Sequence, residues 1–192
     1  MSHRSSTERI ANIIRQALAD GHIVDIEGLG TFRPTAKGFD FVPEVRPRIF
    51  LAYVHEDLAA ARRLFRDLKN ADYQPWLDKE SLLPGQNWPR SIDHAIEVSD
   101  FFMPCFSKRS VLKRGEFQSE LRFALDCAAK MPLDDMFVIP VRLDDCVLPE
   151  RITQHLQQVD LFPGWADGLA RIRRTIDSEL VRKRRTDLPL AS

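Results

Sequence analysis

The spacing of hydrophobic residues changes near residues 43–47. From Arg48 onward, apolar runs of four to eight residues alternate with segments in which apolar positions recur at helical spacing. The runs predict buried strands, and the helical spacing predicts amphipathic helices. Strands and helices in alternation build a parallel sheet with helices on both faces. We therefore predict a flavodoxin-like, doubly wound α/β fold for this part of the chain.

The expected elements can be placed along this part. Strands are expected at residues 48–54, 73–78, 101–106, 136–143 and 158–162, and helices at 58–68, 88–98, 116–130 and 166–181. The segments 79–87 and 107–115 are expected to be loops. Ligands of such sheets bind outside the carboxyl ends of the strands. The candidate site therefore lies in the loops that follow residues 54, 78, 106 and 143.

The first 46 residues have a different pattern, which predicts a small α+β unit. Ser5 and Glu8 have the spacing of a capping box at a helix start. Gly21 is expected to end that helix in the left-handed conformation. Short strands are expected near Ile23, Phe32 and Phe39–Phe41, and EVRP (44–47) is expected to be a linker. The predicted division is 1–46 for this unit, 47–165 for the α/β domain, and 166–192 for its last helix with a basic tail.

Composition limits the class of protein. The 192 residues are 44% hydrophobic, with 28 basic and 28 acidic residues. This balance suits a globular protein and provides no net charge for a general attraction to nucleic acid. No apolar run is long enough to cross a membrane, and the N-terminus lacks the apolar stretch of a signal peptide. Three widely spaced cysteines are expected to be reduced thiols in a cytoplasmic protein.

The order of short motifs from residue 48 to residue 162 resembles a bacterial-type TIR domain. The matching segments are RIFLAYVHED, PWLDKESLLPGQNW with its BB loop, SDFFMPCFSKRS, EFQSELRFALD, FVIPVRLDDCVLPE and QVDLF. Many TIR domains of this kind are NAD⁺ glycohydrolases, and some make cyclic ADP-ribose isomers. Others are protein-interaction modules without known catalysis. Because one fold hosts both, the activity has to be argued from the site.

The resemblance implies that Glu120 is the catalytic residue. Glu120 begins the family's E-L-x-x-A-L pattern, on the helix after the third strand. It lies at the border of the helix's apolar stripe, where ionisation is costly and a carboxylate can face a cleft. Nicotinamide leaves NAD⁺ as a neutral group, so one fixed anion that stabilises positive charge on the ribose suffices. The alternatives are a solvated carboxylate at Glu120 and a catalytic role for Glu116, one turn earlier.

Candidate substrate-binding residues surround Glu120 in the sequence pattern. They are Tyr53, His55, Asp78, Gly85, Trp88, Ser107 and Phe117. His55 could contact a phosphate or face solvent, and Trp88 could stack on the substrate or anchor its helix. Ser107, like Ser110, could instead cap the helix. Phe117 could replace a tryptophan that many enzymatic TIR domains carry at the position of Glu116, or it could belong to the core.

No nucleotide-binding glycine motif and no metal-binding spacing is present in the sequence. No cofactor and no metal are therefore expected, and the TIR resemblance implies NAD⁺ as a substrate.

The segments ADGHIVDIEGLGTFRP (19–34) and FDFVPEVRP (39–47) resemble part of the HU/IHF fold. That family dimerises through this region and grips DNA with a long basic arm, which this chain lacks. The resemblance implies self-association or docking of a protein partner rather than DNA binding. A plain structural extension is the alternative.

These patterns favour an NAD⁺ glycohydrolase that self-assembles through its TIR surfaces and BB loop, in bacterial antiviral defence or as an effector. The alternative is a non-catalytic TIR interaction module. It is favoured by the missing tryptophan and by Val54, where the family often carries a serine or arginine. A DNA-associated TIR protein is a third reading. No membrane partner is expected.

Overall fold

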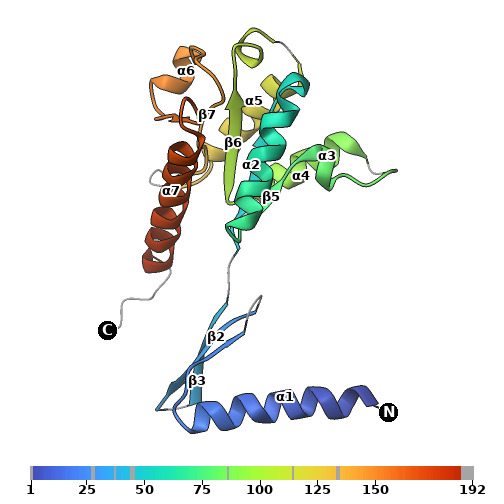
Figure 1. Ribbon diagram of the computed structural model, residues 1–192, viewed down its shortest axis with the longest axis vertical. Helices are drawn as coiled ribbons and strands as arrows, with labels where there is room; N and C mark the ends of the chain where they lie inside the picture. The colour runs from blue at the N-terminus through green and yellow to red at the C-terminus, as the bar shows by residue number, and fades with distance from the viewer. Residues whose placement is uncertain are drawn as a thin grey trace. The chain divides into compact units, whose positions relative to one another are not determined.

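A computed structural model describes residues 2–26, 29–36, 38–43, 46–85, 87–113, 115–132 and 135–186 of the chain. It divides into two compact units, Met1–Arg46 and Pro47–Ser192 (Figure 1). Each unit is built on a sheet of its own. Glu44 and Val45, in the predicted linker, lie outside the described residues.

The second unit contains a five-stranded parallel sheet in the order β5-β4-β6-β7-β8. Its strands are β4 (Arg48–Ala52), β5 (Gln74–Trp76), β6 (Phe101–Phe106), β7 (Val141–Arg142) and β8 (Val159–Asp160). Ile49 in β4 lies opposite Pro75 in β5 and Phe101 in β6. The predicted α/β fold with a parallel sheet is confirmed.

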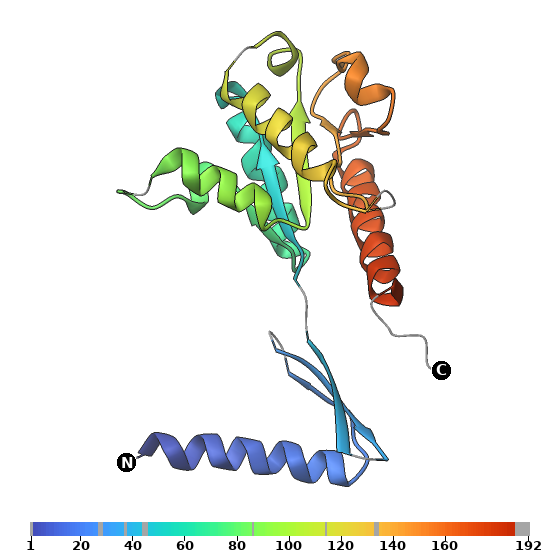
Figure 2. The same ribbon diagram turned by 180° about the vertical axis from the view of Figure 1, so that it is seen from behind.

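Helices cover both faces of this sheet (Figures 1 and 2). The helices α2 (Leu58–Asn70) and α7 (Trp165–Thr186) contribute to one buried cluster, and α4 (Trp88–Glu97) and α5 (Glu116–Ala128) contribute to the other. Shorter helical segments are η1 (His55–Asp57), α3 (Asp78–Ser81), η2 (Ser110–Leu112) and α6 (Glu150–Thr153). Among the described residues, no helix has both the length and the apolar character that a membrane crossing requires.

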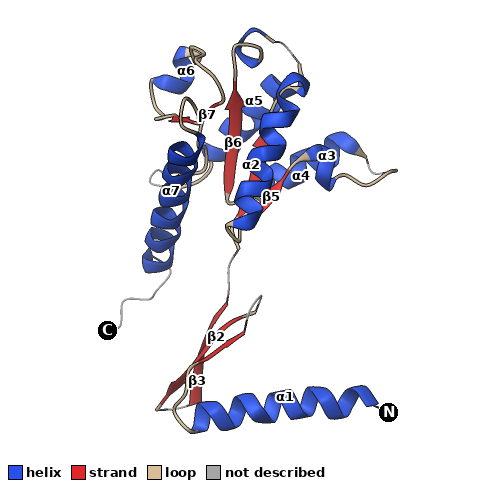
Figure 3. Ribbon diagram, in the orientation of Figure 1, coloured by secondary structure: helices blue, strands red, loops and turns tan. Residues whose placement is uncertain are grey.

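The central strand β6 explains why the two clusters form. Its six residues are all buried, with Phe101, Met103 and Cys105 in one cluster and Phe102 and Phe106 in the other. Burying one such side chain stabilises the fold by about 1.5–3 kcal/mol. Figure 3 shows this strand between the helices of the two layers. The apolar run FFMPCF is therefore a strand buried on both faces, as predicted.

Helix α7 lies unusually close to β8. A Cβ added at Gly168 would lie 2.2 Å from the carbonyl oxygen of Asp160 and 2.9 Å from the Leu161 side chain. The helix therefore contacts the strand backbone with no side chain between them.

Several sequence predictions in this unit were wrong in extent. The strands expected at 48–54, 73–78 and 158–162 are shorter, as β4, β5 and β8, and the loop expected at 107–115 contains η2. The strand expected at 136–143 pairs only through a bridge at Val138 and the short β7, because Pro140 has no N–H to donate to the ladder. Residues 79–81, expected in a loop, belong to α3. Acidic residues in its first turn suit the positive end of the helix dipole, and Ser81 Oγ accepts a hydrogen bond from the Leu77 N–H at 3.2 Å.

The first unit consists of α1 (Ser2–Ala19) and an antiparallel sheet in the order β1-β2-β3. The strands are β1 (Val24–Ile26), β2 (Gly30–Thr35) and β3 (Gly38–Pro43). Gly21 has a φ of 83°, which confirms its predicted role after the helix. The predicted capping box was wrong, because α1 begins at Ser2 and both Ser5 and Glu8 lie inside it.

Candidate active site

A cleft of about 160 Å³ opens at the carboxyl ends of β4 and β5, beside the start of α5. The cleft is lined by Phe50, Leu51, Tyr53, His55, Trp76, Asp78, Lys79, Trp88, Glu116 and Glu120. A second hollow of similar size shares Trp88, Glu116 and Glu120 with it and continues along α4 and α5. The edge of the sheet at which such folds bind ligands therefore carries a hollow bounded by acids and aromatic rings.

Glu120 lies on the inner border of α5. Phe117, Leu121 and Ala124 on the same helix are buried in the core and fix the direction in which the Glu120 side chain leaves the helix. Burial raises the pKa of the Glu120 carboxyl to about 8, and the negative charges of Asp78 and Glu116 act in the same direction. A carboxyl with so high a pKa inside a cleft is a feature of functional sites.

Tyr53 and Asp78, which follow β4 and β5, are joined by a hydrogen bond in the lining of the cleft. The Tyr53 hydroxyl donates a hydrogen bond of 2.6 Å to Asp78 Oδ1, which connects the loop after β4 with the start of α3. Burial raises the pKa of Tyr53 well above its usual value, and the bond to Asp78 and that residue's charge add to the shift. The phenol therefore stays neutral and keeps its proton as a hydrogen-bond donor.

Two tryptophans form the aromatic wall of the cleft. Trp76 stacks on Phe50 with 4.7 Å between ring centroids and 15° between ring planes. Trp88 is 41% exposed at the first position of α4, which Asn87 caps by accepting a hydrogen bond from the Arg90 N–H. Its ring is therefore accessible at the cleft, and its two predicted roles, stacking on the substrate and anchoring the helix, both stay predictions.

The charges around the cleft favour a ligand with a positive region. Asp78, Glu116 and Glu120 supply carboxyl groups, and Lys79 supplies an ammonium group 6.0 Å from the ring centroid of Trp88. Among the described residues, no group of three or more His, Cys, Asp and Glu side chains is arranged to hold a metal ion.

Comparison with known proteins identifies the family. A family model described as a TIR domain matches residues 49–173. The chain belongs to the TIR domain family. The match to the family model begins at residue 49. The predicted resemblance of residues 19–47 to the HU/IHF fold is not supported.

Relatives and solved structures resemble the chain over different lengths. Uncharacterized protein y4cD of Sinorhizobium fredii is 24% identical over 177 residues, which cover 92% of this chain and 27% of that protein. The chain therefore spans about a quarter of the length of this relative.

Two solved structures share the TIR fold. The TIR domain of the Toll-related receptor TRR-2 from Hydra magnipapillata has a TM-score of 0.51 at 21% identity, covering 71% of this chain and 97% of that one. The TIR-STING receptor from C. gigas, solved in complex with 2′,3′-cGAMP, has a TM-score of 0.53 at 19% identity, covering 67% and 41%.

Three of the predicted substrate-binding residues of the TIR domain do not line the cleft. Gly85 is exposed in the BB loop with a φ of 87°, a conformation that suits glycine. Phe117 is buried and meets Phe106 edge-on at 5.5 Å, so it belongs to the core. Ser107 is buried in a polar network next to the site. Tyr53, His55, Asp78, Trp88 and Glu120 do line the cleft.

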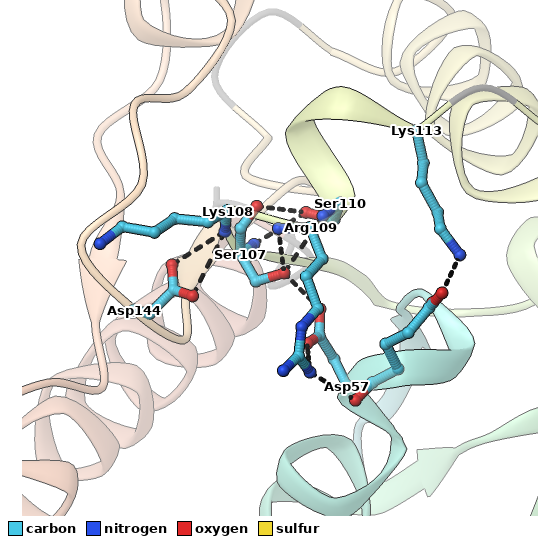
Figure 4. Close-up of polar contacts among 8 residues, drawn as sticks. Asp57, Ser107, Lys108, Arg109, Ser110, Lys113 and Asp144 are labelled. Carbon is cyan, nitrogen blue, oxygen red and sulfur yellow. Dashed lines mark hydrogen bonds and ion pairs between the residues drawn. The ribbon is translucent and has the colours of Figure 1, made fainter.

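Ser107 has a structural role in this network (Figure 4). Its hydroxyl donates a hydrogen bond of 2.5 Å to Asp57 Oδ2 and accepts from the backbone N–H groups of Arg109 and Ser110. The first residue before α5 is Gly115, so neither Ser107 nor Ser110 caps that helix. Ser107 instead connects η1, which carries His55 into the cleft, with the turn of η2.

Asp57 was missed by the sequence analysis. It is 8% exposed, and burial raises the pKa of its carboxyl, while the Ser107 hydroxyl and the Arg109 guanidinium at 3.7 Å oppose the shift. Ion pairing of Lys113 with Glu56 and a hydrogen bond from the Lys108 N–H to Asp144 complete the cluster. The segment HED (55–57) contains no pattern from which the burial of Asp57 could have been predicted.

Proposed function

We propose that the chain is an NAD⁺ glycohydrolase in which Glu120 is the catalytic residue. The products are nicotinamide and ADP-ribose or a cyclic ADP-ribose isomer. The observation that carries this proposal is the half-buried Glu120 carboxyl, with a pKa near 8, in an acidic and aromatic cleft at the carboxyl ends of β4 and β5. Membership of the TIR family, which includes NAD⁺ glycohydrolases, supports it.

The reaction breaks the bond between ribose C1′ and the nicotinamide nitrogen. Both electrons of that bond go to the nitrogen, so the positive pyridinium leaves as neutral nicotinamide and positive charge develops on the ribose. The ionised Glu120 carboxylate stabilises this charge or binds the ribose hydroxyls. Water, or another acceptor, then forms the new bond to C1′ and loses a proton. No general acid is needed for the leaving group.

The other residues of the cleft suit parts of the dinucleotide. The exposed Trp88 ring can stack on the pyridinium, because a cation is attracted to the face of an indole. In that role Trp88, on α4, replaces the tryptophan that many enzymatic TIR domains carry where this chain has Glu116. The Lys79 ammonium, near the same ring, can contact the pyrophosphate. A positive substrate also favours ionisation of Glu120.

The test is release of nicotinamide from NAD⁺ by the purified chain at high concentration, with the products resolved by mass. Glu120→Gln is expected to lower the rate by at least about a hundredfold, since it removes the charge on which the transition state depends. Glu116→Gln tests the alternative assignment, because Glu116 lines the same cleft one turn earlier on α5, and this variant is expected to remain active. An active Glu120→Gln variant would refute the assignment, and the second product separates hydrolysis from cyclisation.

A non-catalytic TIR interaction module is the second candidate. Val54 is buried and cannot donate a hydrogen bond to a dinucleotide, and Glu116 stands where many enzymatic relatives carry a tryptophan. Absence of nicotinamide release from self-assembled wild-type protein would favour this candidate. For the enzyme, the proposed setting is antiviral defence or action as an effector, with activity increased by assembly through TIR surfaces and the BB loop.

A further inference from the structure

The described part of the unit Met1–Arg46 buries few apolar side chains completely. Among its described residues, Leu18 is the only hydrophobic side chain that is buried. Domains of this size have few core residues, and the smallest depend on disulfides, metals or oligomerisation. The three cysteines of the chain all lie in the other unit and are free. The unit therefore lacks a sufficient core of its own.

One uncovered surface is a stripe along α1. Ile10, Ile13, Ile14 and Ala17 recur at helical spacing, and we refer to them as the helix stripe. Ile10 is 59% exposed and Ile13 is 69% exposed. The N-terminal half of α1 extends beyond the sheet of its own unit (Figures 1 and 2). Among the described residues of the unit, Ile10 and Ile13 at that end of the stripe stay uncovered.

The second uncovered surface is one face of the small sheet. Five side chains share one face of the sheet because of the strand register. Phe32 in β2 lies opposite Val24 in β1 and Phe41 in β3. Pro34 in β2 lies opposite Phe39 in β3, two residues away on each strand and so on the same face. We refer to these five side chains as the aromatic face. Phe32 lies 4.5 Å from Phe41 and 5.6 Å from Phe39 between ring centroids, yet Phe39 is 58% exposed and Phe41 37%.

The other face of this sheet is mostly polar. It carries Asp25, Thr31, Arg33 and Asp40, and the Thr31 hydroxyl donates a hydrogen bond of 2.9 Å to Asp25 Oδ1. Segregation of this kind is typical of a sheet that buries one face against another element. Because α1 leaves Phe39 and Phe41 exposed, this face offers an apolar surface to an element outside the small unit.

We propose that a second copy of this chain covers these surfaces. The helix stripe of each copy packs on the aromatic face of the other, so that a two-fold axis relates two identical contacts. Specific interfaces bury about 1,200–2,000 Å² in total. The area of one exposed stripe is small for such an interface. In the proposed two-fold dimer both helix stripes and both aromatic faces are buried, which increases the buried area.

The charge of the unit favours a copy of itself over other partners. Residues 1–46 contain six basic and six acidic residues and are formally neutral. Two copies therefore meet without net repulsion. The same neutrality offers no attraction to nucleic acid or to a strongly charged protein.

The test is the mass of the full chain in solution, measured by sedimentation over about a hundredfold range of concentration. The wild type is expected to form a dimer. Ile13→Lys and Phe39→Glu each bury a charge on an apolar surface of the partner, so each variant alone is expected to have the mass of one chain. A mixture of the two variants is expected to regain a dimer, because Lys at 13 then faces Glu at 39 in one contact while the other contact is unchanged.

The matched controls place the same charges outside the proposed interface. Asn12→Lys lies on the polar side of α1, and Thr35→Glu lies on the polar face of the sheet; both residues are exposed and both variants are expected to remain dimers. A monomeric wild type would overturn the proposal. So would dissociation of the controls, dimers that persist in both variants, or a mixture that stays monomeric. The readout is mass, so it is independent of whether the chain hydrolyses NAD⁺.

Discussion

Glu120 is a carboxyl whose charge depends on its surroundings. Burial and the two neighbouring acids, Asp78 and Glu116, hold its pKa near 8, so the free protein carries it mostly protonated at neutral pH. The proposed reaction needs the ionised form. The environment that suits the carboxylate to catalysis also keeps the ionised form a minor fraction of the free protein at neutral pH.

The pH dependence of catalysis follows from this pKa. We expect kcat/KM for NAD⁺ to rise with pH through about 8, because kcat/KM reports the ionisation of groups in the free enzyme. Glu116→Gln removes one of the charges that raise the pKa, so its profile is expected to shift to lower pH. Initial rates of nicotinamide release across the pH range measure both. A profile that falls with pH in this range would contradict the role of an ionised Glu120.

The same group affects stability. Its pKa is about 8 in the folded chain and 4.5 for an ordinary glutamate, so the folded state holds a proton that the unfolded state loses. The stabilisation is present below the lower value and is lost as pH rises through the higher one. The free energy of unfolding of the wild type relative to Glu120→Gln should therefore fall by a few kcal/mol between about pH 5 and about pH 9. Urea unfolding at both pH values measures it, and a constant difference would contradict the raised pKa.

Trp88 is the residue on which substrate orientation is expected to depend. Trp88→Ala should raise KM for NAD⁺ roughly two- to thirtyfold, which corresponds to a loss of about 0.5–2 kcal/mol of cation–π interaction. Trp88→Phe keeps an aromatic face and should recover most of the affinity. Steady-state kinetics of the two variants test this role. An unchanged KM in Trp88→Ala would show that Trp88 does not contribute to substrate binding and serves only as part of α4.

At the scale of elements, Ser107 connects two segments that flank the cleft. Ser107→Ala would leave the buried Asp57 carboxyl without its hydroxyl donor, at a cost of about 1–3 kcal/mol in the free energy of unfolding. Because η1 carries His55, KM for NAD⁺ should rise as well. Chemical denaturation measures the stability. Ser119→Ala, at an exposed position of α5, is the matched control and should change stability little.

The sequence predicted those elements whose pattern is local. The observed strand Phe101–Phe106 matches the expected strand at both ends. An uninterrupted apolar run is buried on both faces in the middle of a parallel sheet, so the polar residues beside it mark its ends. The strand expected at 136–143 is mostly irregular, because Pro140 interrupts the ladder within an otherwise apolar run. The short α3 has too few residues for a helical period to be detected.

The site was predictable only in part. Glu120, Tyr53 and Asp78 belong to recognisable motifs, and the fold brings them to one cleft. Lys79 and Trp76 also line it, but their positions depend on how α3 and β5 turn their side chains. Phe117 and Ser107 lie outside the lining of the cleft, because spacing alone does not separate a side chain that faces the cleft from one that faces the core.

At the scale of the whole molecule, the two proposals together predict activity that depends on concentration. If a dimer through residues 1–46 brings two TIR domains together, Phe39→Glu should lower the activity per chain at low concentration and approach the wild type when the protein is crowded. Thr35→Glu should behave like the wild type throughout. Rates of nicotinamide release over a dilution series test this. Equal activity of Phe39→Glu and wild type at every dilution would show that catalysis does not depend on dimerisation through the N-terminal unit.

The close approach of α7 to β8 also bears on how relatives of this chain can be recognised. Any side chain at residue 168 would collide with a backbone carbonyl, which cannot move as the end of a flexible side chain can. A chain that carries a larger residue there must shift α7 away from the sheet and repack Ile172 and Ile176. We therefore expect this glycine to anchor the alignment of distant relatives in a region where the surrounding helix sequence is free to diverge.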